Sequence, residues 1–94
     1  MRKYETMFIL NPTLSLEETK GLAEKFKAII ETAGKIEKVD EWGKRRLAYE
    51  IEDHKDGYYF LINFQAEQTM LTELERSYKL TEGVLRHLTI NKED

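Results

Sequence analysis

The segment from Tyr58 to Phe64 constrains the fold of this chain most strongly. It reads Tyr-Tyr-Phe-Leu-Ile-Asn-Phe and contains neither glycine nor proline. Successive side chains of a β-strand point to opposite faces, and here both faces are apolar near the start of the segment. A strand of this kind needs cover on both sides. The sequence therefore predicts the central strand of a sheet.

A second strand and a helix are predicted ahead of it. Tyr4–Leu10 alternates as a strand does, and Asn11-Pro12 ends it. Ser15 is a candidate helix N-cap, and Glu18 three residues later completes the pattern of a capping box. Apolar residues follow at helical spacing. Gly34 is expected to end this helix in a left-handed turn.

The segment 35–52 allows two interpretations. It is either one long strand with a bulge or bend near Gly43, or two short strands. The Asp-Gly pair that closes the segment 53–57 predicts a turn there.

The last third of the chain predicts a helix and a strand. The helix runs from about Thr69, its expected N-cap, to Lys79. Gly83 interrupts the chain, and Val84–Asn91 is expected to be the last strand. Two registers are possible for that strand. In one, Leu85, His87 and Thr89 face the core; in the other, Val84, Leu88 and Ile90 do. Whether Arg86 or His87 faces away from the core is therefore open.

The predicted order is β-α-β-β-α-β, an α+β arrangement of the split βαβ type within one domain over residues 1–94. Right-handed crossovers would place both helices on one face of a four-stranded antiparallel sheet. The other face would be open. Its apolar residues make it a candidate binding surface, and they are Met7, Ile9, Tyr59 and Leu61.

The composition of the chain limits the range of functions that it can have. The chain has no cysteine, which excludes disulfides and thiolate metal sites, and its first apolar run is too short for a signal sequence, so we expect a cytoplasmic protein. The net charge of −3 argues against binding nucleic acid through bulk charge. An RNA-binding role would need local basic patches or a basic partner.

Catalysis is not expected. The two histidines, His54 and His87, lie in separate elements, and no nucleophile elbow, phosphate loop or metal-ligand spacing occurs. A small acylphosphatase could use this topology but would require a glycine-rich anion loop after the first strand, where this chain has Asn11–Leu14. We therefore predict no enzyme activity, no cofactor, no metal site and no small-molecule substrate.

An RNA-recognition motif of the usual type is also a poor match. The window 56–63 departs from its third-strand pattern at Asp56, Tyr59 and Asn63. Tyr58 and Phe60 would have to stack bases on the open face. They share a face with Phe64, which is expected in the core.

Basic residues concentrate at Lys44-Arg45-Arg46, inside a recognisable segment. Residues 42–51 read Trp-Gly-Lys-Arg-Arg-Leu-Ala-Tyr-Glu-Ile. They resemble the signature of the bacterial small-subunit ribosomal protein S6 family, in which glycine, any residue, a basic residue and a polar or charged residue precede Leu-Ala-Tyr-x-Ile. The opening residues 1–5 and the late segment 84–88 are also similar to that family. The resemblance covers essentially the whole chain.

This resemblance implies a ferredoxin-like fold and a structural role in translation, without catalysis or cofactor. It implies a cytoplasmic ribosomal protein, a constituent of the small ribosomal subunit that binds the central domain of 16S ribosomal RNA as a heterodimer with ribosomal protein S18. With a net charge of −3, we expect pairing to come first and RNA binding second. The alternative is a ferredoxin-like protein-interaction or small-ligand regulatory module.

Candidate site residues follow from this interpretation. Trp42 is expected to pack at the sheet edge and orient the basic segment. The residues predicted to contact RNA phosphates and sugars, with Tyr4 as a stacking candidate, are Arg2, Tyr4, Lys44, Arg45, Arg46 and Arg86. Those predicted to contact the partner protein are Met7, Ile9, Tyr59, Leu61 and Asn63.

Overall fold

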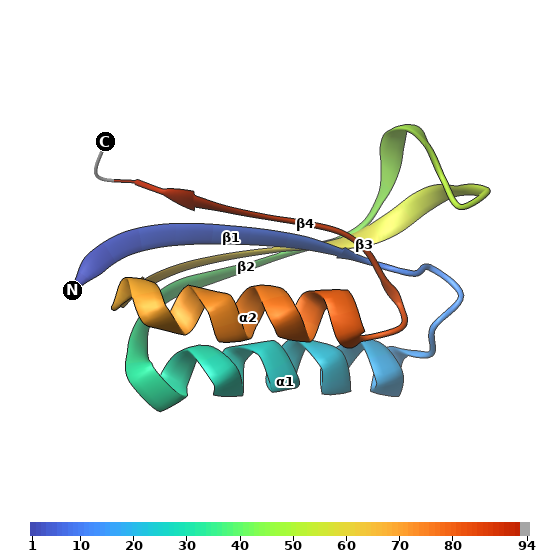
Figure 1. The fold of residues 1–94 in the computed structure, drawn as a ribbon. Coiled ribbons are helices and arrows are strands. Elements are labelled where there is room, and N and C mark those ends of the chain that lie inside the picture. The colour runs from blue at the N-terminus through green and yellow to red at the C-terminus, as the bar shows by residue number, and fades with distance from the viewer. Residues whose placement is uncertain (93–94) are drawn as a thin grey trace.

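The fold, in a computed structural model that describes residues 1–92, is the predicted β-α-β-β-α-β arrangement. The elements are β1 (Arg2–Leu10), α1 (Leu16–Ala33), β2 (Gly34–Ile51), β3 (His54–Ala66), α2 (Gln68–Leu80) and β4 (Val84–Asn91). The strands form one antiparallel sheet in the order β2-β3-β1-β4. Both helices cover the same face of this sheet (Figure 1), as expected.

The core lies between the sheet and the helices. Phe8 of β1 stacks on Phe60 of β3 with ring centroids 5.0 Å apart, and Phe26 and Tyr78 contribute from the two helices. The segment 58–64 does lie in an inner strand, flanked by β1 and β2. Its even-numbered residues face the helices, which confirms the predicted alternation.

The predicted capping box opens α1. The backbone N–H of Glu18 donates to the Ser15 hydroxyl at 3.1 Å, and the Ser15 N–H donates to the Glu18 carboxylate at 3.0 Å. The left-handed conformation expected at Gly34 is wrong, because its backbone is extended and already forms the first residue of β2. A Cβ at this position would lie 2.5 Å from the carbonyl oxygen of Gln65, so close approach to β3 explains the glycine.

The start of α2 also differs from its prediction. The N-cap is Glu67, without a side-chain cap, and Thr69 lies inside the first turn. The reason is that β3 continues pairing as far as Ala66, opposite Gly34 and Arg2. Only Glu67 remains between the strand and the helix.

The segment 35–52 is one long bulged strand, which decides between the two interpretations. Gly43 has a φ of 74° and lies at a shift in register against β3, so the bulge predicted there is confirmed. A wider bulge follows. Arg46 pairs with Asp56 and Ile51 pairs with His54, so the segment 47–50 lies opposite Lys55 alone.

The turn predicted at 53–57 is shifted toward the N-terminus. Glu52 and Asp53 have φ values of 48° and 67°, the combination required by a tight hairpin turn. Asp56 and Gly57 instead belong to β3. Gly57 serves close packing rather than the turn, since a Cβ there would collide with the side chain of Ile9.

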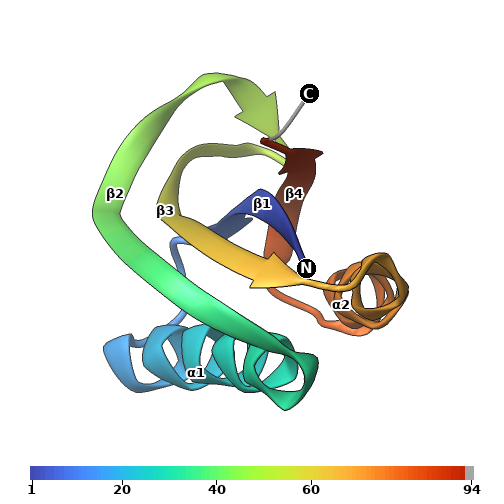
Figure 2. The same ribbon diagram turned by 90° about the vertical axis from the view of Figure 1, so that its left-hand side faces the viewer.

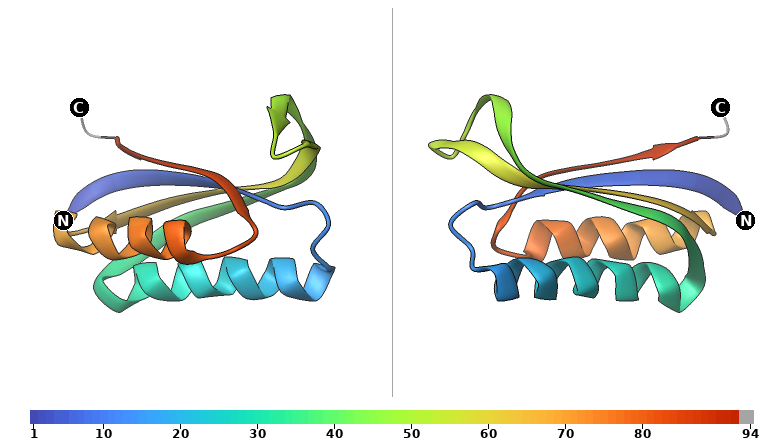
Figure 3. Two further views of the ribbon diagram at one scale, coloured as in Figure 1. Left: turned by 45° about the vertical axis from the view of Figure 1, so that its right-hand side comes forward. Right: turned by 180° about the vertical axis from the view of Figure 1, so that it is seen from behind.

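The outer hairpin, defined here as residues 44–57, extends past the end of β1 and curls away from the helices (Figures 1 and 3). Figure 2 shows β2 arching from the side of α1 round toward β4. The hydroxyl of Tyr49 thereby accepts a hydrogen bond from Arg86 of β4, although β2 and β4 are opposite edges of the sheet.

The register of β4 answers the question left open by the sequence. His87 pairs with Phe8 and stacks on Tyr78 on the helix side, with ring centroids 5.0 Å apart. Thr89 also faces this side, where its hydroxyl lies 2.9 Å from that of Thr6. Arg86 therefore projects from the open face.

Candidate RNA and partner interface

An apolar patch occupies the middle of the open face. Met7 lies between Leu61 of β3 and Leu88 of β4 in the ladder, and Ile90 follows along β4. Leu88 is 55% exposed and Ile90 45% exposed. Asn63 lies beside this patch and accepts a hydrogen bond from the Lys92 ammonium at 2.9 Å.

Ile9 is not part of this accessible patch, contrary to its expected role. It is only 3% exposed, because Gly57 of the outer hairpin packs directly on it. Leu47 of the same hairpin is also buried. The curl of β2 and β3 covers this end of the sheet, and alternation along β1 alone does not reveal it.

The basic cluster lies in the outer hairpin, and its side chains diverge. Lys44, Arg45 and Arg46 are all exposed. The Arg45 Nε–H donates to the carbonyl oxygen of Trp42 at 3.3 Å, and its guanidinium lies 5.7 Å from the centre of the indole ring. Because strand residues alternate in direction, Lys44 and Arg46 project from the face opposite Arg45.

Arg86 is held by the outer hairpin. Its guanidinium donates to the Tyr49 hydroxyl at 3.0 Å and lies 6.0 Å from the centre of that ring. The hydrogen bond to Tyr49 raises the pKa of Arg86 above its already high ordinary value. Arg86 therefore presents a permanent positive charge beside the hairpin.

Trp42 packs on Tyr59 of β3, as expected for a residue that orients the basic segment. The two rings are nearly parallel, with centroids 6.3 Å apart and an interplanar angle of 21°. The indole nonetheless remains 46% exposed.

Two of the predicted RNA contacts lie apart from this cluster. Arg2 begins β1 and pairs with Ala66, whereas the outer hairpin lies beyond the pair Leu10–Tyr58 at the opposite end of the sheet. At about 3.3 Å per residue, the two ends are roughly 26 Å apart. Tyr4 is 3% exposed and packs on Phe64, so its ring is a core residue and is not accessible for stacking.

Sequence reasoning misses several members of this surface. Tyr49 stands out in the sequence only as part of the family signature, and the competing registers of β4 leave Leu88 and Ile90 unassigned. Polar His87 and Thr89 obscure the alternation of β4, because both find partners on the helix side. The wide bulge at 47–50 is defined only by the pairing with β3, so no sequence pattern places Tyr49 next to Arg86.

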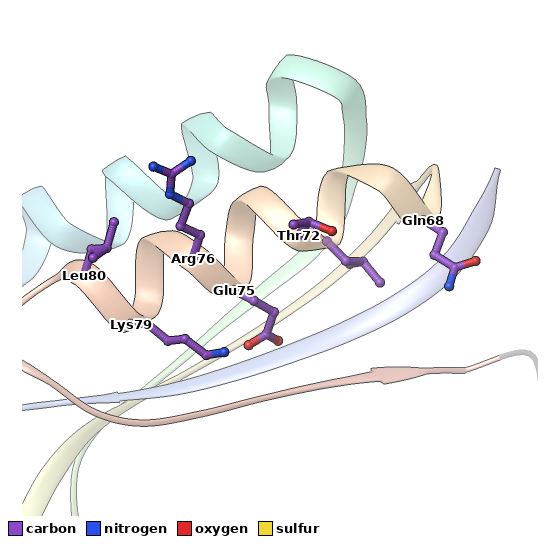
Figure 4. A pocket seen from close by; sticks show the side chains of 7 residues that line it. Gln68, Thr72, Glu75, Arg76, Lys79 and Leu80 are labelled. Atoms are coloured by element: carbon purple, nitrogen blue, oxygen red, sulfur yellow. The ribbon is translucent and has the colours of Figure 1, made fainter.

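The surface of α2 offers no comparable cluster among the residues that the structure describes. An open groove of about 640 Å³ runs along it (Figure 4), with lining residues Gln68, Leu71, Thr72, Glu75, Arg76, Lys79 and Leu80. One acidic and two basic side chains line it, and the acid, Glu75, is directed to His87 with 3.0 Å between its carboxylate oxygen and Nδ1. Within residues 1–92, no group of side chains suits a metal ion, and no helix is long and apolar enough to cross a membrane.

Comparison with known proteins connects this geometry to a family. The family model described as ribosomal protein S6 matches residues 3–91. The chain is 56% identical to small ribosomal subunit protein bS6 of Thermoanaerobacter pseudethanolicus, covering 100% of both chains. It is 53% identical to the Clostridium novyi protein of the same name, covering 99% of each.

The fold gives the same result. The crystal structure of 30S ribosomal protein S6 from Thermotoga maritima superimposes with a TM-score of 0.93 at 41% sequence identity, covering 97% of this chain and 87% of that one. These relatives are ribosomal structural proteins and not enzymes, so the prediction of a non-enzymatic protein is confirmed. The chain belongs to the ribosomal protein S6 family.

Proposed function

We propose that this chain is a structural constituent of the small ribosomal subunit and binds the central domain of 16S ribosomal RNA in a heterodimer with ribosomal protein S18. The observation that carries the proposal is the match to the S6 family over residues 3–91. The relatives with 56% and 53% identity carry the name of small-subunit proteins.

The charge distribution supports a divided role. The net charge is −3, so the chain neutralises few phosphates by itself. The outer hairpin nevertheless carries three consecutive exposed basic residues, Lys44, Arg45 and Arg46, and it contacts Arg86 through Tyr49. A basic partner would supply the remaining electrostatic attraction.

The open face has separate regions that suit the partner protein and the RNA. Its apolar patch, formed by Met7, Leu61, Leu88 and Ile90, is suited to the partner protein, with Tyr59 and Asn63 beside it. The outer hairpin and Arg86 are suited to RNA. Arg2, at the other end of β1, would make a separate contact.

A salt series tests the RNA contacts. In the heterodimer, Lys44→Ala, Arg45→Ala and Arg46→Ala together are expected to lower the slope of log affinity against log salt by roughly one per lost phosphate contact. The matched control removes three lysines from the helix side, Lys20, Lys25 and Lys79, for the same change in net charge. An unchanged slope in the first variant, or an equal fall in the control, would contradict the assignment.

A further inference from the structure

We infer that Trp42, Arg45, Tyr49 and Arg86 form a stacking platform for unpaired RNA bases. This inference rests on the proposed RNA-binding function and adds a mode of contact to it. The side chains come from β2 and β4, which are opposite edges of the sheet, and β2 arches round toward β4 (Figure 2). The hydrogen bond from Arg86 to the Tyr49 hydroxyl joins the two edges.

Exposure of the two aromatic rings is the first observation. Trp42 is 46% and Tyr49 65% exposed, and they are the only aromatic residues among the large exposed apolar side chains of residues 1–92. Burying such rings would stabilise the fold, yet both stay accessible on the same strand. Tyr49 reaches its position through the wide bulge at 47–50, where the ladder with β3 is interrupted.

The second observation is that an arginine guanidinium lies over each ring. The Arg45 guanidinium lies 5.7 Å from the Trp42 ring centre, and that of Arg86 lies 6.0 Å from the Tyr49 ring centre. Both arginines also have hydrogen bonds that fix them, to the Trp42 carbonyl and the Tyr49 hydroxyl. The platform is therefore partly ordered before a ligand binds, which lowers the entropy lost on binding.

This combination of groups identifies the ligand class. Aromatic rings and guanidinium planes stack on unpaired bases, and the remaining N–H donors of arginine reach phosphates and sugars. A protein partner would be better served by the neighbouring apolar patch, where Met7, Leu61 and Leu88 lie side by side in the ladder. The open face thus divides into an apolar half and a cationic, aromatic half.

Substitution of the rings distinguishes stacking from charge. Trp42→Leu and Tyr49→Leu keep the charge and much of the apolar volume but remove the π surface. Each is expected to weaken binding of the heterodimer to the central-domain RNA by about 5- to 150-fold, with the salt slope unchanged because stacking releases no counterions. Trp42→Phe should retain most of the affinity, and Tyr49→Phe, which keeps the ring but loses the hydrogen bond with Arg86, should bind more tightly than Tyr49→Leu. Leu80→Ala, at an exposed apolar position on α2, is the control.

Trp42 fluorescence provides a test in the folded protein without loss of the ring. It is the only tryptophan of the chain, so the difference in emission between the heterodimer and its Trp42→Phe variant reports this site. Addition of the central-domain RNA is expected to quench that difference signal. This readout decides the question if a leucine variant fails to fold.

Three outcomes overturn the platform. The first is that both leucine variants bind the RNA as tightly as the wild-type heterodimer does. The second is that the RNA does not quench the Trp42 fluorescence. The third is that the leucine variants bind S18 more weakly than the wild type does when no RNA is present, which would assign the rings to the partner protein. Failure of the wild-type heterodimer itself to bind the RNA would instead contradict the proposed function.

Discussion

Gly57 shows how a single residue sets the shape of the candidate interface. It lies inside β3 opposite Arg45, and its missing side chain leaves room for Ile9. The outer hairpin can therefore pack onto the end of β1. Gly21, by contrast, lies on the exposed surface of α1, where an added methyl group would have open space around it.

The two glycines give opposite predictions. Gly57→Ala is expected to lower the free energy of unfolding by about 1–3 kcal/mol, because the methyl group overpacks against Ile9. Gly21→Ala is expected to raise it by about 0.5–1 kcal/mol, because alanine favours the helix. Urea denaturation measures both. A neutral Gly57→Ala would show that the hairpin does not depend on this contact.

Glu18 gives a prediction about pH. Hydrogen bonds from the Ser15 backbone and side chain lower the pKa of this carboxyl below its ordinary value of 4.5. Since the pKa is lower in the folded state, the contribution of Glu18 to stability is present above pH 4.5 and is lost as the pH falls through the lowered value. The advantage of the wild type over Glu18→Gln should therefore shrink in acid.

Thermal unfolding across pH measures this difference. Glu17→Gln is the control, because it removes a charge from the same helical turn without touching the capping box. A difference between wild type and Glu18→Gln that stays constant from neutral pH into the acid range where Glu18 is protonated would contradict the linkage.

At the scale of elements, Arg86 and Tyr49 join the outer hairpin to β4. Arg86→Ala is expected to open the hairpin more often, because this side-chain hydrogen bond connects opposite edges of the sheet. Because this hydrogen bond is exposed to solvent, the expected effect is small, with amide exchange roughly 2-fold faster at the paired residues of the hairpin. Exchange in β1 should stay unchanged.

Tyr49→Phe provides the matched comparison, since it removes the hydroxyl acceptor and keeps the ring against Arg86. It should accelerate exchange less than Arg86→Ala does. If neither variant changes exchange in the hairpin, then packing of Leu47 and Gly57 on Ile9 holds it alone.

The elements were predictable where the pattern is local. Alternation in 58–64 and the capping box at Ser15 and Glu18 each depend on neighbours in sequence, and the structure confirms both. The glycines were harder, because Gly34 and Gly57 serve contacts with distant residues rather than turns. A dipeptide signal cannot distinguish a turn from a close approach of two strands.

At the scale of the whole molecule, the candidate surface was only partly predictable. The open face follows from the order of the elements, so Met7, Tyr59 and Leu61 could be assigned to it. The curl of the outer hairpin depends on the wide bulge of β2 and on contacts with β1 and β4. That curl buries Ile9, and no pattern within β1 indicates it.

The net charge of the whole molecule explains why RNA binding is expected to need a protein partner. A chain with net charge −3 whose only run of three basic residues is Lys44-Arg45-Arg46 can engage only a few phosphates. For about four contacts, the expected salt slope of the free chain is around 3 to 4. The apolar half of the open face would meanwhile bind the partner protein, so that pairing precedes RNA binding.

The most direct test of this account compares the affinity of the chain alone and of its heterodimer with S18 for the same central-domain RNA at one salt concentration. The account predicts that the heterodimer binds tighter by roughly 5- to 150-fold or more, the usual range of coupling between two binding partners. Equal affinity of the free chain and the heterodimer would contradict it.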